Sequence, residues 1–470
     1  MSLAQWTYAR VPAALQTVLL NAYAWGVARH RYGRPYERMV AEFLEHERWT
    51  VEQLRAYQAE RLKVVLRAAL KSPLSRERLT KAGVAPDDIR SPEDIARLPL
   101  LSKDTVREHE SGLMTRTRPE RGWLNGHTSG TTGSPLSVWY DRRTCVVNNA
   151  VDRRQKAWSG MPADAWIGLL LGRVVVPPTV HKPPFWRANH VLRQVWFSSF
   201  HVSDETLPSY LAEIRRRGLE YLEGYPSTMY LVARYLVRRG ETLPLKAVFT
   251  SSETLLDVQR ETIEQAFKCR LYDFYGLAER VIFAGECEVH GAKHVSEDFG
   301  WVEIVNDEGQ PVPAGQAGYL VGTSLHNVAM PMLRYRTSDV SAFVLEPCPC
   351  GRPFRRLRNV TTKAEDFVVT PEGRVISPSI LTHPFKPLHG IAESQIVQDR
   401  PDRLTIKLVP TARLPEEEVA ALIASLRERV GPSMKIEIQE VSSIPRERSG
   451  KFRWVVSTVE HPYRLSWDQP

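Results

Sequence analysis

The sequence predicts an α/β protein: a large N-terminal region built mainly on parallel sheets, followed by a small α+β C-terminal domain. Between about residues 126 and 345, short β-type runs alternate with helical stretches, which is typical of parallel sheet. Past about residue 363 a predicted hairpin, two further strands and one helix indicate a smaller unit. The 470 residues, 43% of them hydrophobic, leave room for two or three domains with a buried core.

The large region divides into two predicted parts. Residues 1–95 are expected to be helical, because apolar residues recur at three- and four-residue spacing along YERMVAEFLEHERWTVEQLRAY. Residues 96–362 form the predicted core, whose elements read in order AWIGLLL, DETLPSYLAEIRRR, YLEGY, PSTMYLVARYLVRR, KAVFTSS, LLDVQRETIEQAF, LYDFYG and GYLVGT. Residues 363–470 form the predicted small domain, with EDFVVTPEGRVIS, RLTIKLVP, a helix over 415–430 and MKIEIQEV.

Composition and charge exclude several classes of protein. The apolar stretch over residues 15–28 contains Gln16 and Asn21 and is shorter than the ~20 residues of a membrane span. We therefore expect a packed or interfacial helix, no membrane span and a cytoplasmic protein. The net charge of +9 arises from Lys and Arg scattered among acids, without a nucleic-acid motif, so no nucleic-acid partner is expected. A monomer or homodimer is expected.

The most informative segment, His127 to Pro135, reads HTSGTTGSP. Glycines and small hydroxyl residues let the backbone turn tightly and direct amides and hydroxyls at phosphate oxygens. The segment lacks the G-x-x-x-x-G-K-[ST] pattern, so it is not a Walker loop. It predicts a phosphate-binding loop of another kind.

This loop resembles the [ST]-S-G-[ST]-T-G-x-P signature of the adenylate-forming superfamily of acyl-CoA synthetases, adenylation domains and luciferases. The chain is more similar to phenylacetate–CoA ligases and their relatives in capsular-polysaccharide gene clusters, which commonly lack the lysine that Leu136 replaces here. The resemblance implies a large adenylation domain of several subdomains and a small, mobile C-terminal lid domain. It implies ATP and Mg²⁺ as well, with Thr128 as a catalytic residue of a loop that holds the β- and γ-phosphates.

Further motifs follow in the order of the same family. Ser252-Glu253-Thr254 resembles the adenine-pocket segment, and DFYGLAE, ending at Glu279, resembles Y-G-x-[ST]-E. RYRTSD, ending at Asp339, resembles Y-R-T-G-D. By resemblance Tyr275 lies against adenine, Glu279 holds Mg²⁺ on the ATP phosphates, and Asp339 accepts from the ribose hydroxyls. The resemblance assigns ATP or AMP binding to Ser129, Gly130, Thr131, Thr132, Gly133, Ser252, Glu253, Thr254, Asp273, Phe274, Tyr275, Gly276, Asp339 and Arg358.

Two segments near the C-terminal part complete the resemblance. TKAED over 362–366 resembles a degraded form of the G-R-x-D-D hinge motif, so the hinge is expected at Lys363, Glu365 and Asp366. IPRERSGK, ending at Lys451, resembles P-[RK]-x-x-S-G-K. In the family this lysine swings in from the small domain and contacts the carboxylate and the α-phosphate. Lys451 is therefore the expected catalytic lysine.

A second cluster of residues points to a metal. Cys287 and either His290 or His294 precede Cys348 and Cys350. Three cysteines and one histidine form a closed tetrahedral set that suits structural Zn²⁺. The C-x2-H spacing favours His290, whereas the resemblance favours His294. The sequence predicts a structural zinc site and leaves its histidine open.

Together these motifs predict ATP-dependent activation of a carboxylic acid as acyl-AMP, with release of pyrophosphate and transfer of the acyl group to CoA. Two alternatives stay open: transfer to an amine, as in polysaccharide modification, and a non-catalytic nucleotide-binding relative. The acid pocket is expected among the aromatic residues of the 160–230 region. The acid itself is not identified.

Overall fold

The computed structural model describes residues 8, 10–127, 136–177, 179–360, 367–376, 378–381, 383–385, 388, 391–410, 413–445 and 453–459. Helices and 3₁₀ turns make up most of the described residues from Ala13 to Leu113. The N-terminal elements are α2 (Ala13–Arg31), α3 (Arg34–His46), α4 (Val51–Ala69), α5 (Pro73–Ala82), the 3₁₀ turns η1 (Pro86–Asp88) and η2 (Pro92–Arg97), α6 (Lys103–Glu108) and α7 (Glu110–Leu113). Thr50 begins α4 with a capping box, since its hydroxyl accepts from the Gln53 N–H and the Gln53 side chain accepts from the Thr50 N–H.

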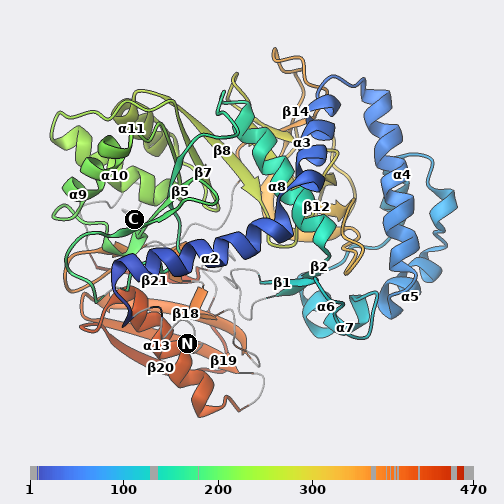
Figure 1. Cartoon of the computed structure of the whole chain (residues 1–470). Coiled ribbons are helices and arrows are strands. Elements are labelled where there is room, and N and C mark those ends of the chain that lie inside the picture. The colour runs from blue at the N-terminus through green and yellow to red at the C-terminus, as the bar shows by residue number, and fades with distance from the viewer. Residues whose placement is uncertain are drawn as a thin grey trace.

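A large mixed sheet forms the centre of the molecule (Figure 1). In spatial order its strands are β14 (Phe343–Val344), β15 (Arg356–Leu357), β10 (Lys293–Val295), β9 (Phe283–Glu286), β8 (Arg270–Gly276), β7 (Ala247–Ser251), β6 (Tyr221–Gly224), β3 (Ile167–Leu170), β5 (Gln194–Phe197) and β4 (Trp186–Asn189). The five strands from β8 to β5 in this order are parallel, and the strands at both edges are antiparallel to them or to each other. The predicted α/β fold class is confirmed.

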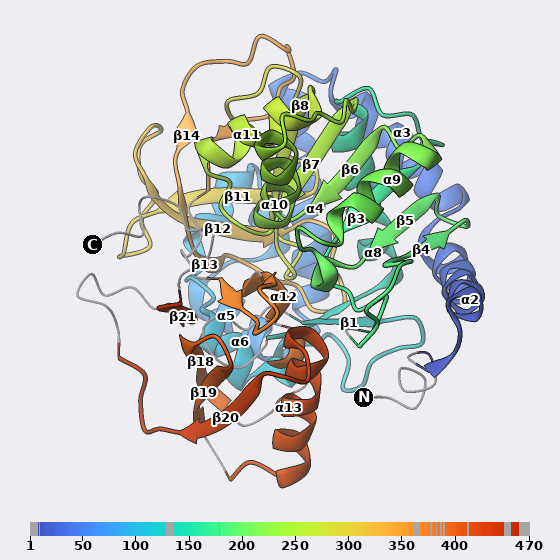
Figure 2. The same cartoon turned by 90° about the vertical axis from the view of Figure 1, so that its left-hand side faces the viewer.

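Helices cover both faces of this sheet. The turn η3 (Ser199–His201), α9 (Leu207–Arg217), α10 (Pro226–Arg238) and α11 (Asp257–Phe267) occupy one side, where Figure 2 shows α10 and α11 in front of β6 and β7. On β7, Val248 packs into the cluster under these helices, whereas Ala247 and Phe249 belong to a separate cluster. Successive residues of a strand point to opposite faces, so both faces of β7 must be apolar to be covered. Helix α8 (Arg142–Ala157) packs along α3.

Two further units of the large region are antiparallel. The hairpin β1 (Leu124–His127) and β2 (Ser137–Tyr140) brackets the glycine-rich loop. The strands β11 (Gly300–Val305), β12 (Gly318–Ser324) and β13 (Tyr335–Ser341) form a three-stranded sheet. The segment GYLVGT was expected in the mainly parallel part, but it forms β12 of this antiparallel sheet. Strand pairing joins distant segments, and the apolar run alone does not reveal it.

A buried ion pair ties α8 to the segment before β11. The Arg154 guanidinium donates to both carboxylate oxygens of Asp298, at 2.6 and 2.9 Å, and neither side chain is exposed. His46 Nδ1, from the end of α3, lies 2.9 Å from Asp298 Oδ2. Burial would raise the pKa of Asp298, but Arg154 and His46 outweigh it and hold the pKa at about 2. Removing one partner leaves an uncompensated buried charge.

The C-terminal elements pack around a hydrophobic cluster that contains Ile406, Leu422, Leu426 and Trp454. They are β16 (Val368–Val369), β17 (Val375–Ile376), α12 (Pro378–Leu381), η4 (His383–Phe385), β18 (Ile391–Arg400), β19 (Arg403–Pro410), α13 (Glu416–Val430), β20 (Lys435–Glu440) and β21 (Val455–Ser457). The last four strands form one sheet in the order β20-β19-β18-β21. The predicted hairpin is confirmed as β16 and β17. The division of the chain into 1–95, 96–362 and 363–470 stays a prediction.

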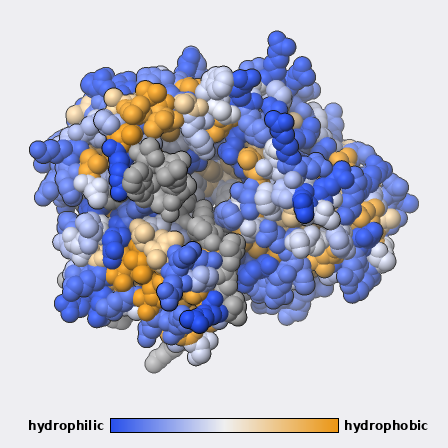
Figure 3. All heavy atoms as spheres, turned by 60° about the horizontal axis from the view of Figure 1, so that its bottom comes forward, coloured by the Kyte–Doolittle hydropathy of each residue, from blue (hydrophilic) through white to orange (hydrophobic). Residues whose placement is uncertain are grey.

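Helix α2 is longer than the apolar stretch that predicted it. It buries Gln16, Leu20 and Ala24, and its Asn21 side chain donates to the Ala188 carbonyl at 2.9 Å, which confirms a packed helix. Within the described part of the chain, no helix combines the length and the apolar character that crossing a membrane needs. On the face in Figure 3, hydrophilic side chains cover most of the surface and apolar ones gather in separate patches.

Candidate functional site

The carboxyl ends of β6, β7 and β8 meet at one edge of the parallel sheet, where open α/β folds bind ligands. A cavity of about 370 Å³ lies there. Its lining includes residues of α8, of these strand ends and of the turns that follow: Asn149, Asp152, Glu223, Tyr225, Ser251, Ser252, Phe274 and Gly276. Ser252 has a φ of 72°, a left-handed conformation that is costly for a residue with a side chain and is concentrated at functional sites. Three of the predicted nucleotide-binding residues therefore line one cavity.

Tyr275 and Asp339, predicted at the nucleotide on separate motifs, contact each other. The Tyr275 hydroxyl donates to Asp339 Oδ2 at 2.6 Å and so links β8 to β13. Burial and the Asp339 carboxylate raise the pKa of Tyr275 well above its ordinary value, so the phenol remains a donor. The Tyr275 ring packs in a hydrophobic cluster, while its neighbour Phe274 lines the cavity. Stacking of Tyr275 on adenine stays a prediction.

Glu279, the predicted magnesium ligand, is held by a tyrosine that the sequence did not indicate. The Tyr335 hydroxyl, on β13, donates to Glu279 Oε1 at 2.6 Å, and the Glu279 side chain is buried. The Tyr140 hydroxyl also donates to the Ala278 carbonyl in the preceding turn. Tyr335 is the tyrosine of the RYRTSD motif, so that motif was the only available signal. Strand β13 therefore positions both carboxylates: its Tyr335 binds Glu279, and Asp339 is itself a residue of the strand.

Lys103, at the start of α6, is a second residue that sequence reasoning missed. Burial lowers the pKa of Lys103 below its ordinary value, while the Glu279 and Asp339 carboxylates act in the opposite direction. Lys103 therefore lies close enough to both carboxylates for their charge to affect its pKa. No motif surrounds it in the sequence, so only the packing of α6 near β13 identifies it.

Two other predicted nucleotide-binding residues have structural partners. Glu253 Oε2 accepts from the Ser227 backbone N–H at 3.0 Å and so satisfies a free donor at the start of α10. Asp273 is buried, accepts from the Thr250 hydroxyl at 2.7 Å and pairs with Lys293 Nζ at 2.9 Å. This pairing accounts for the buried Asp273 carboxylate without a nucleotide. Nucleotide binding by Asp273 stays a prediction without geometric support.

The remaining predicted nucleotide contacts are less defined. Arg358 is exposed, and its backbone N–H donates to the Ala342 carbonyl at 2.9 Å just after β13. Thr254, the next residue after Glu253, is half-buried. Outside the described residues lie the loop residues Thr128, Ser129, Gly130, Thr131, Thr132 and Gly133, the hinge residues Lys363, Glu365 and Asp366, and the catalytic candidate Lys451.

The predicted metal ligands come together. One ligand atom each from Cys287, His294, Cys348 and Cys350 lies within 4.8 Å of all the others. Cys287 Sγ lies 3.8 Å from Cys348 Sγ, and His294 Nε2 lies 3.3 Å from Cys350 Sγ. His294 Nδ1 lies 3.1 Å from the Phe354 carbonyl, a bond that leaves Nε2 as the coordinating nitrogen. Three thiols and one imidazole fit the tetrahedral preference of Zn²⁺.

The structure also separates the two candidate histidines. His290 has a φ of 62° in the turn after β9, and its Nδ1 lies 3.5 Å from Glu286 Oε2. Its ring packs on Tyr272, with centroids 4.6 Å apart. His294 lies on β10, and burial lowers its pKa to about 4, so the imidazole is neutral and available to a metal at neutral pH. His290, which the C-x2-H spacing favoured, is therefore not part of the cluster, and His294, which the resemblance favoured, is its fourth member.

Known proteins resemble this chain over most of its length. The family described as the CapK C-terminal domain matches residues 368–458. Protein CapK of Staphylococcus aureus is 24% identical over 381 residues, covering 78% of this chain and 81% of that protein. Phenylacetate-coenzyme A ligase of Thermus thermophilus is 28% identical over 455 residues, covering 86% and 96% of the two chains.

Solved structures show the same fold. 2-Hydroxyisobutyryl-CoA ligase, in complex with 2-HIB-AMP and CoA in the thioesterification state, superposes with a TM-score of 0.56 at 19% identity, over 88% of this chain and 91% of that one. The same ligase in the postadenylation state, in complex with R3-HIB-AMP, gives 0.55 at 21% identity, over 88% and 91%. Motifs, fold and relatives agree: the chain is similar over most of its length to phenylacetate–CoA ligases and to CapK, and it has the fold of 2-hydroxyisobutyryl-CoA ligase.

Proposed function

We propose that this chain is an acid–thiol ligase that activates a carboxylic acid with ATP and transfers the acyl group to CoA. The observation that carries the proposal is the pair of contacts from β8 and its turn to β13, Tyr275 to Asp339 and Glu279 to Tyr335. They bring the residues of two separate nucleotide motifs together, and Phe274 and Gly276 on either side of Tyr275 line the cavity of about 370 Å³. A protein that had lost the activity would have no need to keep both.

In the first half-reaction an oxygen of the acid attacks the α-phosphorus of ATP. The bond from that phosphorus to the bridging oxygen breaks, and pyrophosphate leaves with the electron pair. The chain's task is to position the reactants and to stabilise the developing charge, because no proton has to move. Lys451 places its positive charge at the α-phosphate, and Asp339 accepts hydrogen bonds from the ribose. Bound Mg²⁺ supplies charge neutralisation on the phosphates, and the Glu279 carboxylate is a suitable hard ligand.

In the second half-reaction the thiol sulfur of CoA attacks the acyl carbon, AMP leaves, and the thiol proton is released. A carboxylate alone does not undergo this exchange at neutral pH, because its leaving group is oxide. Rotation about the segment Lys363–Asp366 withdraws Lys451 and admits the acceptor. A second candidate, motivated by the resemblance to relatives in capsular-polysaccharide gene clusters, is transfer to an amine after the same adenylation.

Two assays test the proposal. Exchange of labelled pyrophosphate into ATP, dependent on an added acid, reports adenylation, and thioester or amide formation identifies the acceptor. Lys451→Ala should lower acyl-AMP formation by orders of magnitude and leave thioester formation from supplied acyl-AMP nearly intact. Lys435→Ala, an exposed lysine on β20, is the matched control and should change neither step. Equal loss of both half-reactions in Lys451→Ala, or no exchange with any acid, contradicts the assignment.

The Cys287, His294, Cys348 and Cys350 cluster has a structural role in this proposal. These four residues would fill all positions of a tetrahedral Zn²⁺, which would leave no coordination site open for catalysis. The cluster connects β9 and β10 to the segment between β14 and β15, at the edge of the sheet that follows the Glu279 turn. A metal there would add to the strand pairing that already joins β9, β10 and β15.

A further inference from the structure

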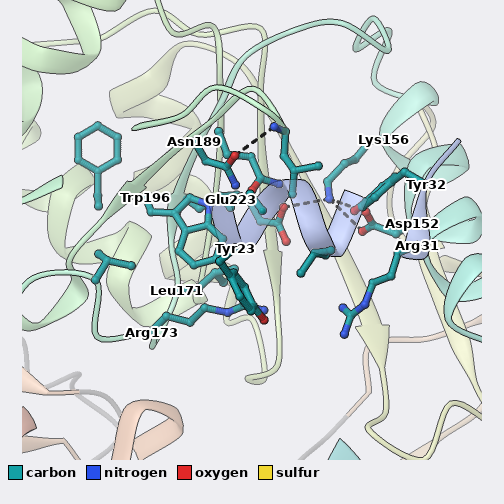
Figure 4. A pocket seen from close by; sticks show the side chains of 17 residues that line it. Tyr23, Arg31, Tyr32, Asp152, Lys156, Leu171, Arg173, Asn189, Trp196 and Glu223 are labelled. Atoms are coloured by element: carbon teal, nitrogen blue, oxygen red, sulfur yellow. Dashed lines mark hydrogen bonds and ion pairs between the residues drawn. The ribbon is translucent and has the colours of Figure 1, made fainter. Parts of the chain in front are cut away.

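A second cavity, of about 320 Å³, lies between α2, α8 and the strands β3 to β6 (Figure 4). It shares Asp152, Leu171, Arg173 and Glu223 with the cavity at the ends of β7 and β8. The two cavities therefore adjoin, and a molecule in the cavity of about 370 Å³ has space to extend into the cavity of about 320 Å³. Apolar walls are present, including Trp196, with the Arg173 guanidinium 4.8 Å from its ring centroid.

The floor of this space is charged. Lys156 Nζ lies 2.7 and 2.9 Å from the two Asp152 oxygens and 2.9 Å from Glu223 Oε2 (Figure 4). Burial opposes ionisation of Lys156, but the two carboxylates outweigh it and raise its pKa. Arg31 and Arg173 also line the cavity, so both signs of charge face this space. The three Lys156 donors are all used within this cluster, whereas the carboxylate oxygens have further lone pairs to offer.

Two amide donors in the same space lack partners. Asn149 lines the cavity at the ends of β7 and β8, and Asn189 lines the cavity beside α2. Their side-chain nitrogens are buried and have no hydrogen-bond acceptor among the described residues. Asn189 is only 1% exposed. Buried amides without a partner are uncommon in folded proteins, and each such group calls for a reason. Here both donors line a space that a ligand can fill.

We propose that the two adjoining cavities hold the acid substrate, and that this acid carries hydroxyl or amino groups beyond its carboxylate. This inference rests on the proposed function, since it takes the cavity beside Ser252 and Gly276 as the place where the acid is activated. A hydroxyl group both donates and accepts, so it satisfies the carboxylates and the free amides together; an amino group satisfies the carboxylates. An unsubstituted aryl or alkyl acid leaves the two amide groups unpaired once it displaces water, and it offers the carboxylates no donor.

Matched pairs of acids test the inference by acid-dependent pyrophosphate exchange: mandelate against phenylacetate, 3-hydroxybutyrate against butyrate, and 4-aminobutyrate against pentanoate. A site built to hydrogen-bond a substituent rejects the analogue without it, so the substituted member of at least one pair should show a kcat/KM about tenfold or more higher. Equal rates within every pair, or faster exchange with the unsubstituted acids, would overturn the inference and leave the proposed function standing. No exchange with any acid overturns both.

A variant ties the preference to the cavity. Asn149→Leu removes one free amide at nearly constant volume and should lower exchange with the preferred substituted acid about tenfold, while its unsubstituted partner is unchanged or faster. Gln155→Met is the matched control: Gln155 is a buried amide on the same helix that also lacks partners among the described residues but lines neither cavity. It should leave the ratio within each pair unchanged. Parallel loss of both members of a pair in Asn149→Leu counts against the assignment.

Discussion

Replacing Tyr275 by phenylalanine removes the hydroxyl that orients Asp339 and keeps the ring in its apolar cluster. The lost contact is a 2.6 Å hydrogen bond to a charged acceptor, a class that contributes about 1.5–3 kcal/mol. Each 1.4 kcal/mol corresponds to about a tenfold change in an equilibrium constant. If Asp339 binds the ribose, the KM for ATP should therefore rise about ten- to a hundredfold, with a smaller change in kcat.

Steady-state kinetics at varied ATP, with a saturating acid, measures this change. Tyr210→Phe is the control for stability: the Tyr210 hydroxyl donates to the Ser198 carbonyl at 2.7 Å in the buried core, away from the Tyr275 cluster. It should lower the melting temperature without changing the KM for ATP. Tyr335→Phe releases Glu279 and should mainly lower kcat and raise the Mg²⁺ requirement. A Tyr275→Phe enzyme with unchanged KM and only the stability loss of Tyr210→Phe would refute the placement of Asp339 at the nucleotide.

Three further outcomes follow from buried groups. Purified protein should contain about one zinc per chain, and Cys348→Ala should lose the metal and lower the melting temperature, whereas Cys269→Ala, outside the cluster, should keep both. Because the Asp298 pKa is about 2 when folded and about 3.9 when unfolded, its contacts with Arg154 and His46 contribute about 2.5 kcal/mol above about pH 5. Denaturant titrations should show that contribution lost as the pH falls from about 5 toward 2, and a flat profile there contradicts the pairing. Lys293→Met should destabilise by about 3–5 kcal/mol, since it strands a buried carboxylate, yet leave the KM for ATP unchanged.

Periodicity along the chain predicted β3, β6, β7 and β8 and the helices α9, α10 and α11, but not β5 or α8. Segments such as PSTMYLVARYLVRR and KAVFTSS have apolar spacings that suit one type of element, and they form α10 and β7 as expected. The order of short motifs predicted the superfamily, because a phosphate loop, two acidic motifs and a terminal lysine are local strings. The antiparallel pairing of β12 was not predictable in this way, since it depends on a partner far along the chain.

The sequence by itself determined the kinds of residues available: carboxylates for a nucleotide and a metal, and thiols and histidines for zinc. Only the tertiary structure decided which of them meet. Lys293 and His294 are neighbours on β10, yet one pairs with Asp273 and the other faces Cys350. Successive side chains of a strand point to opposite faces, and strand register decides what each face contacts. For the same reason Tyr335 was invisible as the partner of Glu279 until β13 was placed beside the turn after β8.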